Sequence, residues 1–423
     1  MTTVSPTPAR TSTEALRAEF APLFSRIRAG AVERERTRDL PFLVVEELKV
    51  SGFTALRVPP EFGGRGVGLS DFAALLVDLA AADSNVAHLF RGHIAFLERL
   101  LLRPPGDHRD QWLRRIGAGA LIGNAASERQ ELSEITTRLE QRGGQWTVTG
   151  TKYYTTGSIY ADWISLSAVH GDTRHSVLVD ASHHGVRVAD DWDGFGQQLT
   201  ASGGLTLSEV PVDPRDVRAF DADDPHSGFV VGLFQMILLL VAAGVAQAAV
   251  EDAVDYVRPR RRTFAHRGEL APRDQDVVQT VVGEVAAKAH AARLIVLSQS
   301  AALDAYARKA ADGTLEGAST DLLTKESQRL ARDVFQAQLV VLELVQRVTT
   351  EIFEVGGASA TSTVRGLDRH WRNARTIASH NPAKYRARAV GEYLLTGEFA
   401  LWGGQGPATG RDGQAEQEDA DHD

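Results

Sequence analysis

The chain has 423 residues, 43% hydrophobic and 24% charged, which is enough for two or three globular domains and unlike a disordered chain. It contains no cysteine, which excludes disulfides, zinc–thiolate sites, iron–sulfur clusters and thiol nucleophiles, so any redox chemistry must come from a bound cofactor. The net charge is −9, but residues 403–423 hold six acids and one arginine, so the rest carries only about −4, too little to indicate a charged partner.

The first part of the chain is predicted to be helical. Residues 1–13 are rich in Thr, Ser and Pro and are expected to be disordered; they lack the apolar run of a secretory signal, so we expect a cytoplasmic protein. Apolar residues at three- and four-residue spacing then predict an α-helical domain over residues 14–117. Its helices are expected at Glu14–Ala29, Asp39–Ser51, Ser70–Ala82 and Asn85–Leu102, with a loop at Pro59–Gly64. Ser70, just before an apolar run, is expected to be an N-cap.

The middle of the chain is predicted to be a β domain over residues 118–222. Short alternating or β-branched runs are separated there by Gly, Asp and Asn, as in an antiparallel sheet. The expected strands are Gln145–Gly150, Trp163–Val169, Ser176–Asp180, Gly185–Ala189 and Gly203–Ser208.

Long helical patterns return over residues 226–402 and predict a bundle, so the fold class is α+β. The expected helices are Phe229–Val257, Arg273–Lys309, Asp321–Glu354 and Pro382–Leu395, followed by a disordered acidic tail over residues 403–423. The uncharged run Phe229–Val250 is long enough to span a bilayer. Its two glutamines and its Ala- and Gly-rich turns favour a helix buried in the bundle, so we expect no membrane contact.

Familiar nucleotide and metal motifs are missing. Gly117-Ala118-Gly119 is followed by a third glycine at the wrong spacing, outside any βαβ unit, which argues against a dinucleotide loop. A P-loop, a GxSxG elbow and an HExxH helix are also absent. Since His88 and His93 are five residues apart, they do not share one helical face, and no metal site is predicted.

Several short motifs nevertheless form an ordered set. They are Phe62-Gly63-Gly64, Ala81–Asn85, Asn124–Glu128 with Ser133 following, Thr151–Ser158, Arg260-Arg261-Arg262-Thr263-Phe264 and Gly356-Gly357-Ala358. Each motif alone is weak, but in this order and within a helix–sheet–helix outline they are specific. The chain resembles the acyl-CoA dehydrogenase superfamily over nearly its whole ordered length.

The resemblance implies a helical domain, a middle antiparallel β domain and a C-terminal four-helix bundle. It also implies a homotetramer with flavin held between the β domain and the bundles of two subunits. Ser127, Thr155 and Thr156 would face the flavin N1–N5 edge with hydroxyl and backbone donors, although β-propensity and turn capping also explain such residues. Arg261 would reach the flavin phosphate of a neighbouring subunit; otherwise its cluster is a solvated helix end. Nucleic acid is not expected of an acidic chain.

The sequence departs from the dehydrogenase pattern at the carboxylate base. The family supplies this base from a Tyr-Glu-Gly-Thr segment near the C-terminus or from a bundle helix. Here the first position reads Ala378–Pro382, and no acid occurs between His226 and Glu251. The segments Leu367–Thr376 with His380-Asn381-Pro382, Lys152–Ser158 with Ala161–Ile164, and Asp191–Gln197 instead resemble the dibenzothiophene monooxygenase branch. Members of that branch use reduced FMN from a separate NAD(P)H-dependent flavin reductase.

The resemblance therefore implies a two-component monooxygenase that forms a C4a-hydroperoxyflavin and oxygenates a small organic substrate at S, N or aromatic C; FAD is an alternative cofactor. A histidine titrates near neutrality, so His380 would either move a proton or only orient the substrate and the peroxide. His93 and Asn124 would line the same pocket, with Thr155 near flavin N5 and Trp192 beside the ring. A satisfied core histidine is the alternative for His93. Two rival functions are an acyl-CoA dehydrogenase with a displaced base and a non-catalytic interaction scaffold.

Overall fold

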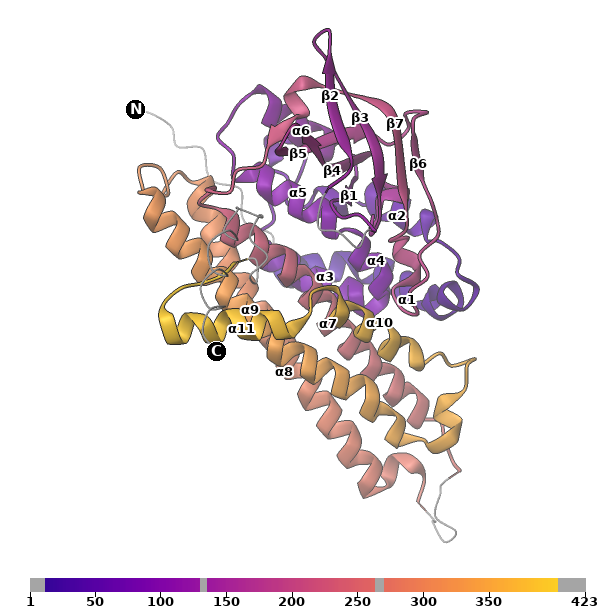
Figure 1. Ribbon diagram of the computed structural model, residues 1–423. Helices are drawn as coiled ribbons and strands as arrows, with labels where there is room; N and C mark the ends of the chain where they lie inside the picture. Colours follow the sequence, from indigo (N-terminus) through magenta and orange to yellow (C-terminus); the bar gives the residue numbers. More distant parts are fainter. Residues whose placement is uncertain (1–11, 130–134, 263–269, 402–423) are drawn as a thin grey trace, which may run out of the picture.

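The computed structural model describes residues 12–129, 135–262 and 270–401. A helical N-terminal part leads into a sheet, which is followed by a second set of helices (Figure 1). The predicted order of a helical part, a β domain and a second helical part is confirmed, and with it the α+β class. Ser133, Thr263, Phe264, residues 1–11 and residues 402–423 lie outside the described residues.

The N-terminal part consists of six helices in the described chain. They are α1 (Thr13–Thr37), α2 (Phe42–Val50), α3 (Leu69–Ala82), α4 (Ser84–Leu89), α5 (Arg91–Leu101) and α6 (Asp107–Gly117). The sequence pattern predicted one helix over Asn85–Leu102, but the structure breaks it at Phe90 into α4 and α5. This break is important for the site, because it gives the two histidines of the segment different surroundings.

Ser70 is not the N-cap of its helix, contrary to expectation. The helix α3 begins at Leu69 with Gly68 as N-cap. Asp304, from a distant helix, accepts hydrogen bonds from the Leu69 backbone N–H and from the Ser70 hydroxyl, both at 2.8 Å. A carboxylate that is distant in sequence therefore accepts from the first N–H group of α3, in place of a neighbouring side chain.

The middle part is one eight-stranded sheet. Its strands are β1 (Ile122–Ala125), β2 (Arg138–Arg142), β3 (Gln145–Lys152), β4 (Trp163–His170), β5 (Thr173–Asp180), β6 (Val186–Val188), β7 (Leu205–Val212) and β8 (Arg218–Ala219). Their order is β6-β7-β3-β2-β4-β5-β8, with β1 paired to β4. Most pairs are antiparallel as expected, but β1 and β2 each pair with β4 in parallel. Parallel pairing is possible because a long connection precedes β4 in each case. The β2–β3 hairpin lies between β1 and β4, and β3 with the loop after it lies between β2 and β4.

The C-terminal part is a helical bundle that extends away from the sheet (Figure 1). It comprises α7 (Ser227–Val257), α8 (Asp276–Ala311), α9 (Thr320–Glu351), α10 (Asp368–His380) and α11 (Ala383–Thr396). Three long helices pack on one another, and the two shorter ones, α10 and α11, pack on α9.

Helix α7 is the core of the molecule. It is the one described helix long and apolar enough to cross a membrane, and its most apolar window is 89% buried inside the protein. The prediction of a buried bundle helix is confirmed. Its side chains join one hydrophobic core with those of α1, α3, α8 and α9, whereas the sheet has a separate core of its own. The site described next lies where α7, α10 and α4 meet the β domain.

Candidate active site

The segment Ser379-His380-Asn381 forms the end of α10 and is fixed to the bundle. The Asn381 side chain donates to Gln235 Oε1 of α7 at 2.8 Å, and its carbonyl accepts from Gln338 Nε2 of α9 at 2.8 Å. Both glutamines are buried. His380 is therefore held at a defined place between two long helices.

His380 lies beside a second histidine and an arginine. Its ring centroid is 6.2 Å from that of His88, and Arg91 Nη1 lies 3.4 Å from His380 Nε2. The residue is solvent-exposed, yet surrounding protein atoms desolvate the ring. This desolvation, together with the positive charge of Arg91 and the neighbouring His88, holds the pKa of His380 well below its usual value.

His88 is buried and neutral, and one of its ring nitrogens faces no protein partner. Its Nδ1 lies 2.9 Å from Gln197 Oε1, while Gln197 Nε2 donates to Ser84 Oγ at 3.0 Å. The amide oxygen must therefore accept, so Nδ1 carries the proton. Burial, reinforced by Arg91, lowers the pKa of His88 to about 4. Within the described residues Nε2 has no hydrogen-bond partner, which leaves it as a free acceptor.

His93 is placed differently. It is 2% exposed, and both of its ring nitrogens are occupied: Nε2 lies 2.9 Å from the Thr54 carbonyl, and Nδ1 accepts from the Ile122 N–H at 3.3 Å. Burial lowers its pKa to about 4. In this arrangement His93 ties α5 to strand β1 and to the chain before α3. The sequence pattern indicated His93 and not His88, because the contact of His88 with Gln197 spans 109 residues.

Asn124 lies on β1 with its backbone close to α5. Gly92 is required there, because a Cβ at this position would come within 2.5 Å of Asn124 Cβ. The Asn124 side chain is half-buried and makes no hydrogen bond to the described part of the protein, while its carbonyl accepts from Ser158 Oγ at 3.3 Å. Its amide is thus available to a ligand.

The loop after β3 presses on α4. Gly157 has φ +77°, and a Cβ there would lie 2.3 Å from the Leu89 carbonyl. The hydroxyls of Thr155 and Thr156 are buried and bond to the Gly203 carbonyl at 3.0 Å and to Ser202 Oγ at 2.7 Å. Both predicted flavin-facing hydroxyls thus have a hydrogen-bond partner within the β domain. The Ser127 hydroxyl, by contrast, is exposed and makes no bond to a described residue.

Aromatic rings are exposed beside these segments. Trp192 donates from Nε1 to the Gly196 carbonyl at 3.1 Å, and its ring meets that of Tyr154 edge-on at 6.1 Å. Phe195 stacks on Trp371 of α10 at 5.7 Å, and Tyr154, Phe195 and Trp371 are all exposed. Exposed rings beside a free hydroxyl fit the needs of an isoalloxazine, which combines flat apolar faces with a polar edge.

Arg261 is not brought to this group of residues within one chain. It is exposed and follows the C-terminal end of α7, at the end of the bundle remote from the sheet (Figure 1). Its neighbour Arg260 instead donates to the Gly356 carbonyl at 3.4 Å and to Ser359 Oγ at 3.2 Å.

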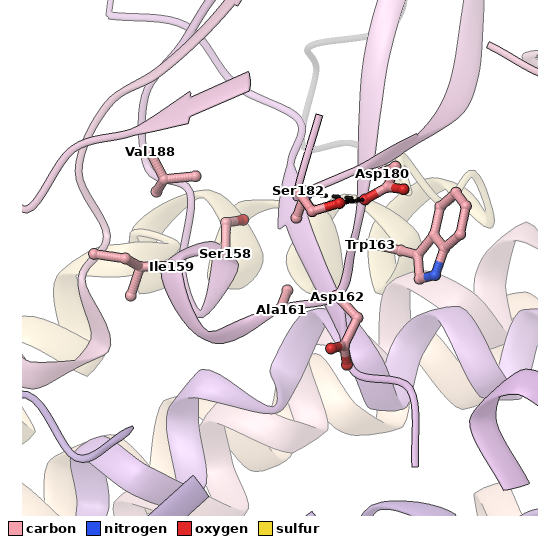
Figure 2. Close-up of a pocket in the computed structure, with 9 residues that line it drawn as sticks. Ser158, Ile159, Ala161, Asp162, Trp163, Asp180, Ser182 and Val188 are labelled. Atoms are coloured by element: carbon pink, nitrogen blue, oxygen red, sulfur yellow. Dashed lines mark hydrogen bonds between the residues drawn. The ribbon is translucent and has the colours of Figure 1, made fainter. Parts of the chain in front are cut away.

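A separate cavity of about 460 Å³ opens on the β domain next to the loop at Ser158 (Figure 2). Two carboxylates, Asp162 and Asp180, line it, and Figure 2 shows them on either side of Trp163. None of the three histidines lines this cavity. Because carboxylates repel a phosphate group, the cavity is poorly suited to a flavin phosphate. Across the described residues, no cluster of His, Asp and Glu could hold a metal ion.

Three domain models of the acyl-CoA dehydrogenase family match this chain: the N-terminal domain at residues 11–120, the middle domain at 124–210 and the C-terminal domain at 236–385. A dibenzothiophene monooxygenase from Rhodococcus qingshengii is 27% identical over 90% of this chain and 93% of its own length. A probable FMNH2-dependent monooxygenase, SfnC, from Pseudomonas putida is 26% identical over 86% of this chain and 91% of its own.

A solved structure is similar throughout. TdsC from Paenibacillus sp. A11-2, in complex with FMN and indole, has a TM-score of 0.83 and 26% identity, and the match covers 92% of this chain and 99% of TdsC. The candidate site residues, from His88 to His380, lie within the three matched domains of the family models. The chain belongs to the acyl-CoA dehydrogenase family, and within it is similar to the dibenzothiophene monooxygenases.

Proposed function

We propose that the protein is a two-component monooxygenase that uses reduced FMN and O2 to add one oxygen atom to a small organic substrate at S, N or aromatic C. One observation carries the proposal: His380 and His88 meet beside Arg91 at the place where a dehydrogenase needs a carboxylate. No described carboxylate contacts any of these three residues. Both imidazoles have lowered pKa values, so they are weaker bases than ordinary histidines, and neither supplies the carboxylate that the dehydrogenase pattern calls for. The similarity to FMNH2-dependent enzymes supports the same reaction.

The residues of the site fit the cofactor. Reduced FMN, when bound, would supply the two electrons that activate O2, so that one oxygen atom of O2 is transferred to the substrate and the other leaves as water. Ser127 offers a free hydroxyl to the polar edge of the ring system, and Trp192, Phe195 and Trp371 offer apolar faces. Thr155 and Thr156 hold the loop after β3 in place through the hydrogen bonds of their hydroxyls to residues 203 and 202. We assign Arg261 to the flavin phosphate of a neighbouring subunit.

Three side chains would act on the substrate. His380 is neutral and exposed, so it can take a proton from substrate and return it to a departing hydroxide. His88 Nε2 is a fixed acceptor that orients a donor group of the substrate. The free Asn124 amide provides both a donor and an acceptor. His93 acts indirectly, by holding α5 against β1.

The assembly and its partners follow from the same proposal. A separate NAD(P)H-dependent flavin reductase delivers reduced FMN, and the enzyme works in the cytoplasm as a homotetramer. The tetramer is supported by exposed apolar side chains on the bundle, which a neighbouring subunit would cover. They include Val277, Leu294, Leu322, Val340, Leu394 and Leu395.

A stopped-flow experiment tests the function. The protein is mixed with reduced FMN under anaerobic conditions and then with oxygenated buffer, and the near-ultraviolet absorbance is followed. We expect an oxygenated flavin species that persists longer than in free FMN. Rapid direct reoxidation, together with bleaching of oxidised flavin by a CoA thioester, would favour the dehydrogenase alternative. Failure to bind flavin at all would favour a non-catalytic scaffold.

A further inference from the structure

Arg91 is a half-buried cation whose guanidinium is desolvated by the surrounding protein, and it has no counter-ion in the described residues. It is the first residue of α5, and no described carboxylate forms an ion pair with it. Burial alone shifts its pKa, to about 10, with no compensating acid. Buried charges are normally paired, because desolvating an unpaired ion is costly. Two other largely desolvated arginines of the N-terminal part do have such partners: Arg57 pairs with Glu98 at 2.6 Å and Arg34 with Asp83 at 2.8 Å.

The protein holds the guanidinium in place but leaves much of it unused. Nε donates to the Phe234 carbonyl at 3.1 Å, and the planar group lies over the Phe234 ring at 4.8 Å. A single long contact of 3.4 Å joins Nη1 to His380 Nε2. An arginine has five N–H donors, so about three remain without an acceptor in the described residues. The group is thus oriented in advance for a bidentate acceptor.

The position of Arg91 connects it to the reacting end of the site. It contacts His380 directly, and its charge depresses the pKa of both His380 and His88. Because both imidazoles are neutral, the local charge is a single uncompensated positive one.

We propose that the substrate is a small organic anion whose carboxylate or sulfinate oxygens pair with Arg91. This inference rests on the proposed monooxygenase function and names its substrate class. The anionic group binds the free guanidinium edge, and the adjacent imidazoles act on the remainder of the molecule. A neutral substrate of the same size would leave the buried charge unpaired and bind more weakly.

Binding without turnover tests the proposal. The protein loaded with oxidised FMN is titrated with 4-fluorobenzenesulfinate, 4-fluorobenzoate and neutral 4-fluorophenyl methyl sulfone, and fluorine NMR gives each Kd. We expect at least one of the two anions to bind about tenfold or more tightly than the sulfone. Arg91→Gln, which can still donate to the Phe234 carbonyl, should abolish that preference. Arg91→Lys should keep part of it, because the charge remains.

Controls separate the possible roles of the arginine. Arg142→Gln removes an exposed arginine of β2 that pairs with Glu140, and it should leave all affinities unchanged. The FMN affinity of Arg91→Gln, measured by fluorescence, should stay within about threefold of wild type, whereas an equal loss of FMN and anion would assign the arginine to the flavin. The proposal is overturned by that result, or by an anion preference that is absent in wild type or intact in Arg91→Gln. A clear preference without oxygen transfer would reject the monooxygenase function alone.

Discussion

Gln197 Oε1 lies 2.9 Å from His88 Nδ1 and thereby fixes the tautomer of a histidine at the candidate site. The same residue also receives a short contact from the bundle, since its backbone N–H donates to Asn373 Oδ1 of α10 at 2.6 Å. Gln197 has φ +52°, a left-handed conformation that its many hydrogen bonds maintain. One residue of the β domain thus sets the geometry of α4 and α10 together.

Replacing Gln197 by methionine should disturb catalysis more than folding. Methionine keeps the length of the side chain but cannot accept the Nδ1 proton, so His88 is free to change tautomer and its Nε2 is no longer a fixed acceptor. We expect product formed per reduced FMN to fall about tenfold, while the FMN affinity stays close to wild type. Nitrogen chemical shifts of His88 report the tautomer. An unchanged tautomer with lost activity would contradict this role of Gln197. The matched control is Gln279→Met, at an exposed position of α8.

Removing His380 should uncouple the reaction. In His380→Ala the FMN affinity should remain within about threefold, whereas product formation falls by roughly 10²-fold or more and hydrogen peroxide release rises. The amounts of product and peroxide per NADH, measured with a flavin reductase, give the coupling. If coupling stays unchanged, His380 has no part in proton movement.

His88 and His380 should act as one unit. Because their rings lie 6.2 Å apart, we expect His88→Ala in the His380→Ala background to cost much less than His88→Ala alone. A double-mutant cycle on product formation measures this coupling. Fully additive losses would mean that the two imidazoles work independently.

The spacing of apolar residues predicted those helices and strands whose side chains pack mainly into a hydrophobic core. The uncharged run of α7 is an example, and its burial confirms the prediction. The start of α3 is a counter-example: Asp304, which lies more than 230 residues away in sequence, caps it, and this contact leaves no signal next to Ser70. Similarly, α10 was not predicted as a helix, because it presents few apolar side chains and meets the bundle along a narrow face.

The candidate site was only partly predicted, because some of its contacts also join residues that are far apart in sequence. His380 stands at a position where the family resemblance directs attention, and the structure places His88 and Arg91 beside it. The importance of His88 depends on a tertiary contact to Gln197 and on the helix break at Phe90. The segment reads as continuous helix in sequence, so nothing local distinguishes His88 from His93. Arg91 would also look like an ordinary helix-end arginine without the knowledge that no carboxylate reaches it.

His93 should make the protein sensitive to acid. Burial lowers its folded-state pKa to about 4, whereas an unfolded histidine has a pKa of about 6.5. Between these values the unfolded chain binds more protons, so the free energy of unfolding decreases as the pH falls from about 6.5 to about 4. For His93 the decrease is roughly 3 kcal/mol. Above pH 6.5 this penalty is absent. Urea unfolding at a series of pH values measures it.

The substitution His93→Gln separates stability from catalysis. Its side chain can still donate to the Thr54 carbonyl but cannot titrate, so the dependence on pH between 4 and 6.5 should be weaker by one proton. Loss of the acceptor for the Ile122 N–H should cost about 1 kcal/mol at pH 7.5. The coupling of FMN oxidation to product formation should persist in this variant. A loss of coupling would show that His93 takes part in catalysis. His184→Gln, at an exposed histidine, should change neither quantity.

Glu128 should be a position of the β domain at which loss of an ion pair strongly destabilises the fold. Its carboxylate accepts from Lys152 Nζ at 2.7 Å and from the Oγ1 atoms of Thr136 and Thr137 at 2.7 Å, and the Lys152 side chain is fully buried. Burial opposes its ionisation, but these hydrogen bonds lower the pKa of Glu128 to about 2. Glu128→Gln leaves a buried ammonium unpaired, so the free energy of unfolding should fall by about 3–5 kcal/mol. Adding Lys152→Met should recover most of that loss, because the double variant buries no charge. Urea unfolding at pH 7 measures both variants, and a loss below about 1 kcal/mol in Glu128→Gln would show that water reaches the ammonium.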